Sequence, residues 1–108
     1  MLDFQHILDY TTRSGLYTFR FGFLYTGARW RAYQLTPIEY GSLASDGPVT
    51  HRYHDAQNNL FFLCWDPEPN TLEEMQAVVA MWCELMQTYL CTGETMDAQY
   101  ARLYGRGN

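Results

Sequence analysis

The most regular short pattern in the chain alternates aromatic residues with smaller or charged ones over residues 17–25. Positions 17, 19, 21, 23 and 25 are all Tyr or Phe. Successive side chains of a β-strand point to opposite faces, so this alternation predicts a strand with one aromatic face. The following Gly27-Ala28 predicts a two-residue type II′ turn into a second strand. This turn pairs Tyr25 with Trp30, Phe23 with Ala32 and Phe21 with Gln34.

The other face of the predicted hairpin is largely basic. The same register gathers on it Arg20, Leu24, Arg29, Arg31 and Tyr33. A hairpin with one apolar and one charged face is expected to be buried on its apolar side only.

A helical period dominates residues 71–91. Apolar residues recur there at steps of three and four and form a stripe roughly 140° wide. Thr71 and Glu74 have the spacing of a capping box, and Gly93 is suited to end the helix in a left-handed conformation. The stripe consists of Met75, Val78, Val79, Trp82, Leu85, Met86, Tyr89 and Leu90.

Weaker patterns fill the rest of the chain. We expect a short helix over 3–12, a loop over 36–48, strands over 49–54 and 60–65, and a short helix over 95–104. The segment 60–65 is apolar on both faces, which places it inside the sheet. The sum is a single α+β domain over residues 1–108. It is a small antiparallel meander of about four strands, with the long amphipathic helix across one face and short N- and C-terminal helices.

Composition narrows the class of protein. The 108 residues are 47% hydrophobic and 18% charged, which is too apolar for a disordered chain. A net charge of −5 argues against a general nucleic-acid binder, which needs a basic surplus. Three cysteines without CxxC spacing fit a reducing compartment. The N-terminus lacks a secretory pattern and no run reaches the ~20 apolar residues of a membrane span, so we expect a cytoplasmic protein.

Acidic residues gather where the long helix begins. Asp66, Glu68, Glu73 and Glu74 concentrate negative charge there, and Met81 and Glu84 continue along the helix. Complementary charge accelerates protein association, and methionine is enriched at interfaces. We therefore expect a non-enzymatic interaction module without cofactor, metal site or catalytic residues, which binds a protein with a basic surface. A small acidic inhibitor or adaptor, such as phages and mobile elements encode, fits this description, and a homodimer is a further expectation.

Two alternatives come from other parts of the chain. Arg20, Arg29, Arg31 and Tyr33 on one sheet face could neutralise and stack single-stranded nucleic acid, although the acidic total argues against direct binding. The second alternative is a cysteine enzyme. A four-residue loop between the strands at 49–54 and 60–65 places His51 opposite Cys64, and an imidazole beside a thiol can activate it. His51 and His54 fall on opposite strand faces, which is a poor arrangement for one metal ion.

Overall fold

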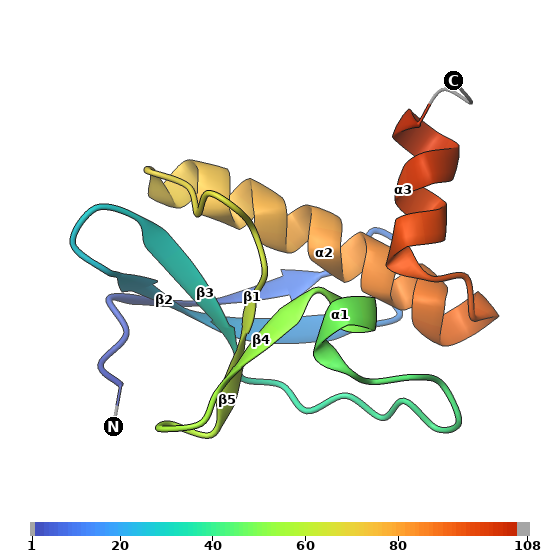
Figure 1. The fold of residues 1–108 in the computed structure, drawn as a ribbon, viewed down its shortest axis with the longest axis horizontal. Helices are drawn as coiled ribbons and strands as arrows, with labels where there is room; N and C mark the ends of the chain where they lie inside the picture. Colours follow the sequence, from blue (N-terminus) through green and yellow to red (C-terminus); the bar gives the residue numbers. More distant parts are fainter. Residues whose placement is uncertain (1, 106–108) are drawn as a thin grey trace.

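The computed structural model describes residues 2–105, which form one five-stranded antiparallel sheet with a long helix and two shorter ones (Figure 1). The chain runs through β1 (His6–Thr11), β2 (Thr18–Tyr25), β3 (Trp30–Gln34), α1 (Gly47–Thr50), β4 (Arg52–Asp55), β5 (Leu60–Leu63), α2 (Leu72–Thr92) and α3 (Met96–Tyr104). The strand order is β1-β2-β3-β5-β4. The α+β class with an antiparallel sheet and a long helix is thus confirmed.

The order of the strands departs from a simple meander. β5 pairs with β3, and β4 forms the edge beyond it. The predicted interior position of the apolar segment 60–65 is therefore correct, although the strand itself ends at Leu63. The strand predicted over 49–54 begins only at Arg52, because Val49 and Thr50 belong to the single turn α1. Pro48 is the second residue of that turn, where its fixed φ is compatible with a helix and no backbone N–H is needed.

The short N-terminal helix predicted over 3–12 is wrong. Residues 6–11 form β1 and pair with β2, with Leu8 opposite Phe21 and Asp9 opposite Arg20. The Arg20 guanidinium donates from Nε to Asp9 Oδ1 at 2.9 Å across the two strands. A short segment with apolar residues in succession fits either period, and pairing with the open side of β2 outweighs its weak helical spacing.

The predicted hairpin is confirmed in detail. β2 and β3 pair with Tyr25 opposite Trp30 and Phe23 opposite Ala32. The backbone N–H of Thr26 donates to the carbonyl of Arg29 at 2.8 Å, which leaves two residues in the turn. Gly27 has a φ of 102°, a value that favours glycine and fits the first position of a type II′ turn.

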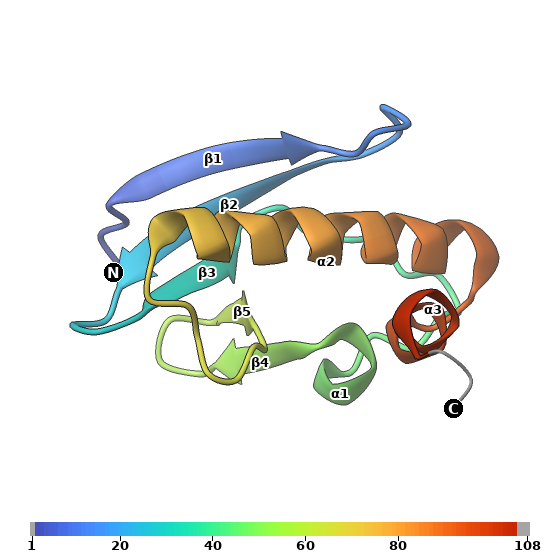
Figure 2. The ribbon, with the colours of Figure 1, turned by 90° about the horizontal axis from the view of Figure 1, so that it is seen from above.

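Helix α2 lies across one face of the sheet and covers its aromatic side (Figure 2). It runs within one residue of the predicted range. The side chain of Thr71 accepts a hydrogen bond from the backbone N–H of Glu74, and Gly93 ends the helix with a φ of 82°. Its buried stripe packs on Phe19, Phe21 and Phe23 of β2, which are at most 2% exposed. The C-terminal helix is confirmed as α3. Within residues 2–105 no helix combines the length and apolar character needed to cross a membrane.

Candidate functional site

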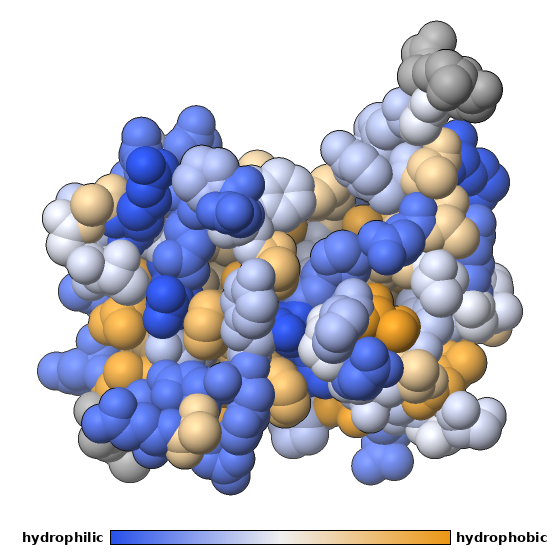
Figure 3. Space-filling view, viewed as in Figure 1, coloured by the Kyte–Doolittle hydropathy of each residue, from blue (hydrophilic) through white to orange (hydrophobic). Residues whose placement is uncertain are grey.

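The strongest candidate for a binding site is an apolar groove between α2, α3 and the segment that follows β5. It encloses a cavity of about 220 Å³. Residues 64–70 lead from β5 alongside the first turns of α2, and α3 projects away from the body of the molecule on the other side of the groove (Figures 1 and 2). Figure 3 shows hydrophobic surface in the hollow between α3 and the body. The lining consists of His51, Leu63, Cys64, Trp65, Val78, Met81, Trp82, Leu85, Met96, Asp97 and Tyr100.

Helix α3 is anchored at its first two turns. Met96 is 2% exposed, and the side-chain amide of Gln99 donates to the carbonyls of Leu85 and Glu94 at 2.9 and 2.8 Å. His51 Nε2 lies 2.7 Å from Asp97 Oδ1, which ties the helix to the turn before β4. These contacts fix the wall of the groove and set the direction in which the rest of α3 projects.

The anchoring leaves apolar side chains facing solvent. Tyr100, Leu103 and Tyr104 on α3 are 48%, 53% and 55% exposed, and Trp65 on the opposite wall is 40% exposed. The rings of Tyr100 and Tyr104 pack with centroids 4.8 Å apart. Contiguous exposed apolar residues around a hollow are typical of an interaction surface.

Three of the predicted acidic residues form no ion pair among the residues described, and one of them, Glu74, lies next to this groove. Glu73 and Glu74 are exposed in the first turn of α2, and Asp66 is exposed beside Trp65. Glu74 shares a hollow with Trp65 and Val78, next to the larger groove. Met81, predicted as part of the same site, lines the groove itself. The structure therefore combines free negative charge and apolar surface in one region.

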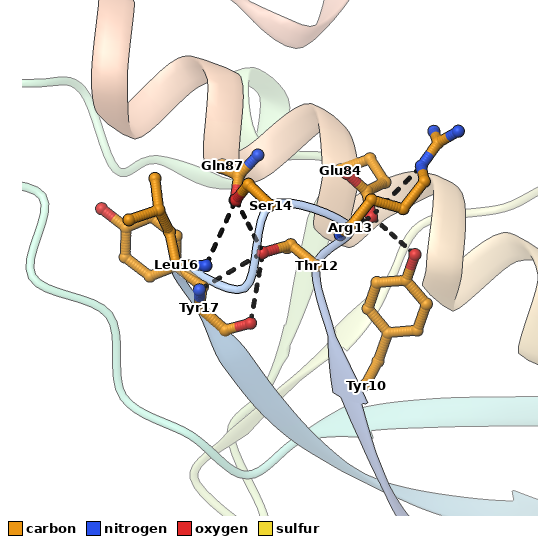
Figure 4. A network of polar contacts seen from close by, with 8 residues as sticks. All are labelled: Tyr10, Thr12, Arg13, Ser14, Leu16, Tyr17, Glu84 and Gln87. Atoms are coloured by element: carbon orange, nitrogen blue, oxygen red, sulfur yellow. Dashed lines mark hydrogen bonds and ion pairs between the residues drawn. The ribbon is translucent and has the colours of Figure 1, made fainter.

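The other two predicted acidic residues form ion pairs within the chain. Glu68 accepts from Arg31 Nε at 2.9 Å, and its backbone carbonyl accepts from Arg29 at 3.1 Å. Glu84 Oε2 accepts from the Tyr10 hydroxyl at 2.6 Å and from the Arg13 backbone N–H at 2.9 Å (Figure 4). Both carboxylates are therefore engaged in holding loops to the fold.

Figure 4 shows how Glu84 and Gln87 on α2 hold the turn between β1 and β2. The Ser14 hydroxyl donates to Gln87 Oε1 at 2.5 Å. Partial burial raises the pKa of Glu84, but the Tyr10 and Arg13 hydrogen bonds outweigh it, so the pKa lies below its ordinary value. Glu84 is thus held ionised by this network, which attaches one end of the sheet to the helix.

The basic face considered for nucleic acid is largely occupied. Arg20 pairs with Asp9, Arg29 donates to Asn70 Oδ1 at 2.6 Å, and Arg31 pairs with Glu68. The Arg31 guanidinium also lies 4.1 Å from the centroid of the Phe62 ring. The arginines remain partly accessible, but each already has an acceptor in the chain.

The prediction that Tyr33 lies on a solvated face is wrong. Tyr33 is 2% exposed and packs between Phe4 and Phe62, with centroid distances of 5.6 and 5.4 Å. Gly22 explains how Phe4 reaches this position, because a Cβ on Gly22 would lie 2.5 Å from Phe4 Cγ. The N-terminal segment therefore covers the part of the face where a base would have to stack.

A backbone hydrogen bond joins Cys64 to His51, but no hydrogen bond joins their side chains among the residues described. Cys64 N–H donates to the His51 carbonyl at 2.9 Å, as the predicted register requires, and both residues line the groove. The nearby Cys64 thiol raises the pKa of the Tyr53 hydroxyl. Sequence reasoning missed Asp97, the partner of the His51 ring. Within residues 2–105, no three His, Cys, Asp or Glu side chains lie close enough together to hold a metal ion.

Comparison of the chain with protein-family models, with curated proteins and with solved structures found no significant match in any of the three.

Proposed function

We propose that this protein is a non-enzymatic interaction module, and that its groove binds a segment of another protein carrying both apolar and basic side chains. One observation carries the proposal: an exposed apolar groove lies next to the carboxylate of Glu74, and Asp66 and Glu73, like Glu74, are exposed and form no ion pair among residues 2–105. Aromatic and methionine side chains supply apolar contact area at interfaces. The carboxylates would select a basic partner and accelerate its approach.

The groove and the charge together indicate the chemistry of the partner. Met81, Leu85 and Tyr100 would receive apolar side chains, and lysines or arginines beside them would meet the carboxylates at the start of α2. A basic surface that otherwise holds nucleic acid is a partner of this kind, so an inhibitor or adaptor of such a protein is the specific form we propose. A cytoplasmic location is part of the proposal and agrees with three free cysteines.

Charge reversal at the start of α2 is the direct test. Peptides selected from a random displayed library against the wild-type protein are expected to combine basic and apolar residues. Glu73→Lys/Glu74→Lys should weaken their binding roughly tenfold or more, mainly through a slower association rate that depends on salt. Met81→Lys should reduce binding further, because it puts a charge into the apolar groove. Affinity and rates would be measured by surface plasmon resonance.

A matched control separates local from general electrostatics. The double variant Asp3→Lys/Glu39→Lys makes the same charge change at two exposed positions outside the groove. It should leave binding within about twofold of wild type. Selected peptides without basic residues, or equal affinity for wild type and Met81→Lys, would contradict the proposal.

A cysteine enzyme is the second candidate, and one observation favours it. His51 Nε2 is held by Asp97 at 2.7 Å at the wall of the groove that Cys64 also lines. An imidazole oriented by a carboxylate on one nitrogen can use the other to take a thiol proton. In this mechanism Cys64 would attack an acyl carbon, and His51 would return the proton to the leaving group. The closeness of the thiol to Tyr53 counts against it.

Alkylation by iodoacetamide decides this second candidate, and the chain provides its own reference thiol. Cys91 is exposed and Cys83 is buried, so mass spectrometry of peptides would follow all three rates in one sample. An active pair predicts that Cys64 reacts faster than Cys91 near neutral pH. It also predicts that His51→Ala, but not His54→Ala, slows this reaction about tenfold or more. A rate for Cys64 below that of Cys91 at every pH would eliminate the enzyme.

A further inference from the structure

Strand β1 forms an open edge of the sheet. It is the outermost strand, and Figure 2 shows no other part of the described chain beyond it. Thr12 N–H donates to the Tyr17 carbonyl at 2.9 Å, which fixes the phase of the ladder between β1 and β2. Because hydrogen-bonded and non-bonded pairs alternate, the backbone groups of Leu8 and Tyr10 face β2. Those of Ile7, Asp9 and Thr11 point outward.

This edge lacks the features that usually prevent pairing. β1 contains neither proline nor lysine, and Ile7 and Leu8 are 55% and 41% exposed. Its one carboxylate, Asp9, is paired with Arg20 of the neighbouring strand. Natural sheets protect exposed edges with charges, prolines, bulges or short strands. The opposite edge, β4, has only four residues, among them Arg52, His54 and Asp55.

We propose that β1 pairs antiparallel with β1 of a second copy, so that two sheets join across a two-fold axis. The register that fits has Leu8 opposite itself. In that register the outward backbone groups of Ile7 bond those of Asp9 in the second copy, and His6 faces Tyr10. A register centred on Asp9 would place two carboxylates opposite each other, which is unfavourable. The charge of the strand therefore disfavours the register centred on Asp9, and the contact of two leucines favours the one centred on Leu8.

The side chains next to β1 also favour pairing with a second copy of the chain. Leu8 lies on the face covered by α2, where it lines a hollow of about 240 Å³ with Tyr10, Gln76 and Val79. A two-fold axis at Leu8 brings the two leucines into contact and adds apolar surface to both hollows. Figure 2 places β1 and α3 on opposite sides of the molecule, so the dimer leaves both grooves open. Two open grooves would give a bivalent binder.

Sedimentation equilibrium combined with two variants tests this interface. The wild-type protein should show twice the mass of one chain at about 100 μM, as a micromolar dimer requires. Ile7→Pro removes an outward N–H without touching a bond to β2, and edge strands tolerate proline at such positions. It should raise the dimer dissociation constant about 100-fold or more, while the circular dichroism spectrum and the melting temperature of the monomer stay nearly unchanged.

Cross-linking identifies the register. In a Cys91→Ser background, Leu8→Cys should form a disulfide-linked dimer on oxidation, because the Cα atoms of a non-bonded antiparallel pair lie about 4.5 Å apart. Thr11→Cys, whose two copies would be far from each other, should stay monomeric. A wild-type monomer at every concentration would overturn the proposal, even if it bound a foreign strand at β1. A dimer that persists in Ile7→Pro, without cross-linking of Leu8→Cys, would also overturn it.

Discussion

Trp82→Ala is expected to lower the free energy of unfolding by about 5 kcal/mol, since deletion of a buried tryptophan side chain typically costs 3–5 kcal/mol and an orphaned carbonyl adds to it. Trp82 is 4% exposed on α2. Its ring meets those of Phe19 and Phe21 edge-on, with centroids 6.0 and 5.7 Å apart. Its indole N–H also donates to the Thr50 carbonyl at 2.9 Å. The substitution therefore weakens the contact of α2 with both β2 and α1.

Urea denaturation followed by far-UV circular dichroism would measure this loss without relying on tryptophan fluorescence. Trp65→Ala is the matched control, because it removes the same atoms from a residue that is 40% exposed. It should cost about 1 kcal/mol or less. Trp82→Phe should fall between the two, since it keeps an aromatic ring but leaves the Thr50 carbonyl unpaired. An equal loss for Trp65→Ala and Trp82→Ala would contradict the proposed packing of α2 on the sheet.

The elements that the sequence predicts well are those whose signals are local. The register between β2 and β3 follows from one turn, because Gly27 supplies the positive φ that a two-residue connection requires. Helix α2 carries its own end signals in Thr71 and Gly93. In both cases the residues that determine the element lie within it or directly beside it, so a periodic pattern is sufficient.

β1 could not be predicted because its determinants lie outside it. Phe4, Ile7 and Leu8 satisfy a helical spacing as well as they satisfy a strand. The choice is made by β2, whose open side takes up the backbone of residues 6–11, and by the pair that Arg20 forms with Asp9. A short segment with an ambiguous pattern adopts the structure that its neighbour in space stabilises.

The sequence predicts which kinds of side chain the candidate site contains, but not the shape of the groove. The sequence indicates Met81 and the free carboxylates at the start of α2, but the groove also requires the position of α3. That position depends on the contact of His51 with Asp97, 46 residues further along the chain. His51 reaches it because its backbone is left-handed, with a φ of 54°. No periodic signal in the sequence reports a contact of this kind.

Arg52 shows the same limit and leads to the second large effect. Arg52 stands in a polar stretch of the sequence between His51 and Tyr53, yet it is only 7% exposed. Its guanidinium donates to Thr50 Oγ1, Gln34 Oε1 and the Ser45 carbonyl at 2.9, 3.0 and 2.8 Å. It also lies 3.8 Å from the centroid of the Phe61 ring. Among residues 2–105 no carboxylate forms an ion pair with it, and burial lowers its pKa.

Arg52→Lys is therefore expected to cost about 3 kcal/mol at pH 7, because an ammonium cannot reproduce the planar set of donors and stays buried without a counterion. The loss should depend on pH. The burial that lowers the pKa of Arg52 should lower the pKa of a lysine there below its ordinary ~10.4. Between these two values the unfolded chain binds more protons than the folded one, so the stability of the variant rises with pH relative to wild type.

Urea denaturation at pH 7 and pH 9.5 would measure this difference. The gap between wild type and Arg52→Lys should narrow at the higher pH, when the buried lysine becomes neutral. Arg29→Lys is the control, because Arg29 is only partly buried and its partners are the Asn70 side chain and the Glu68 carbonyl. It should cost under about 1 kcal/mol at both pH values. A loss of stability for Arg52→Lys as small as that for Arg29→Lys, or one that does not change with pH, would mean that the Arg52 guanidinium is not held in a site from which water is excluded. The connection it makes between the loop after β3 and the start of β4 would then not stabilise the fold.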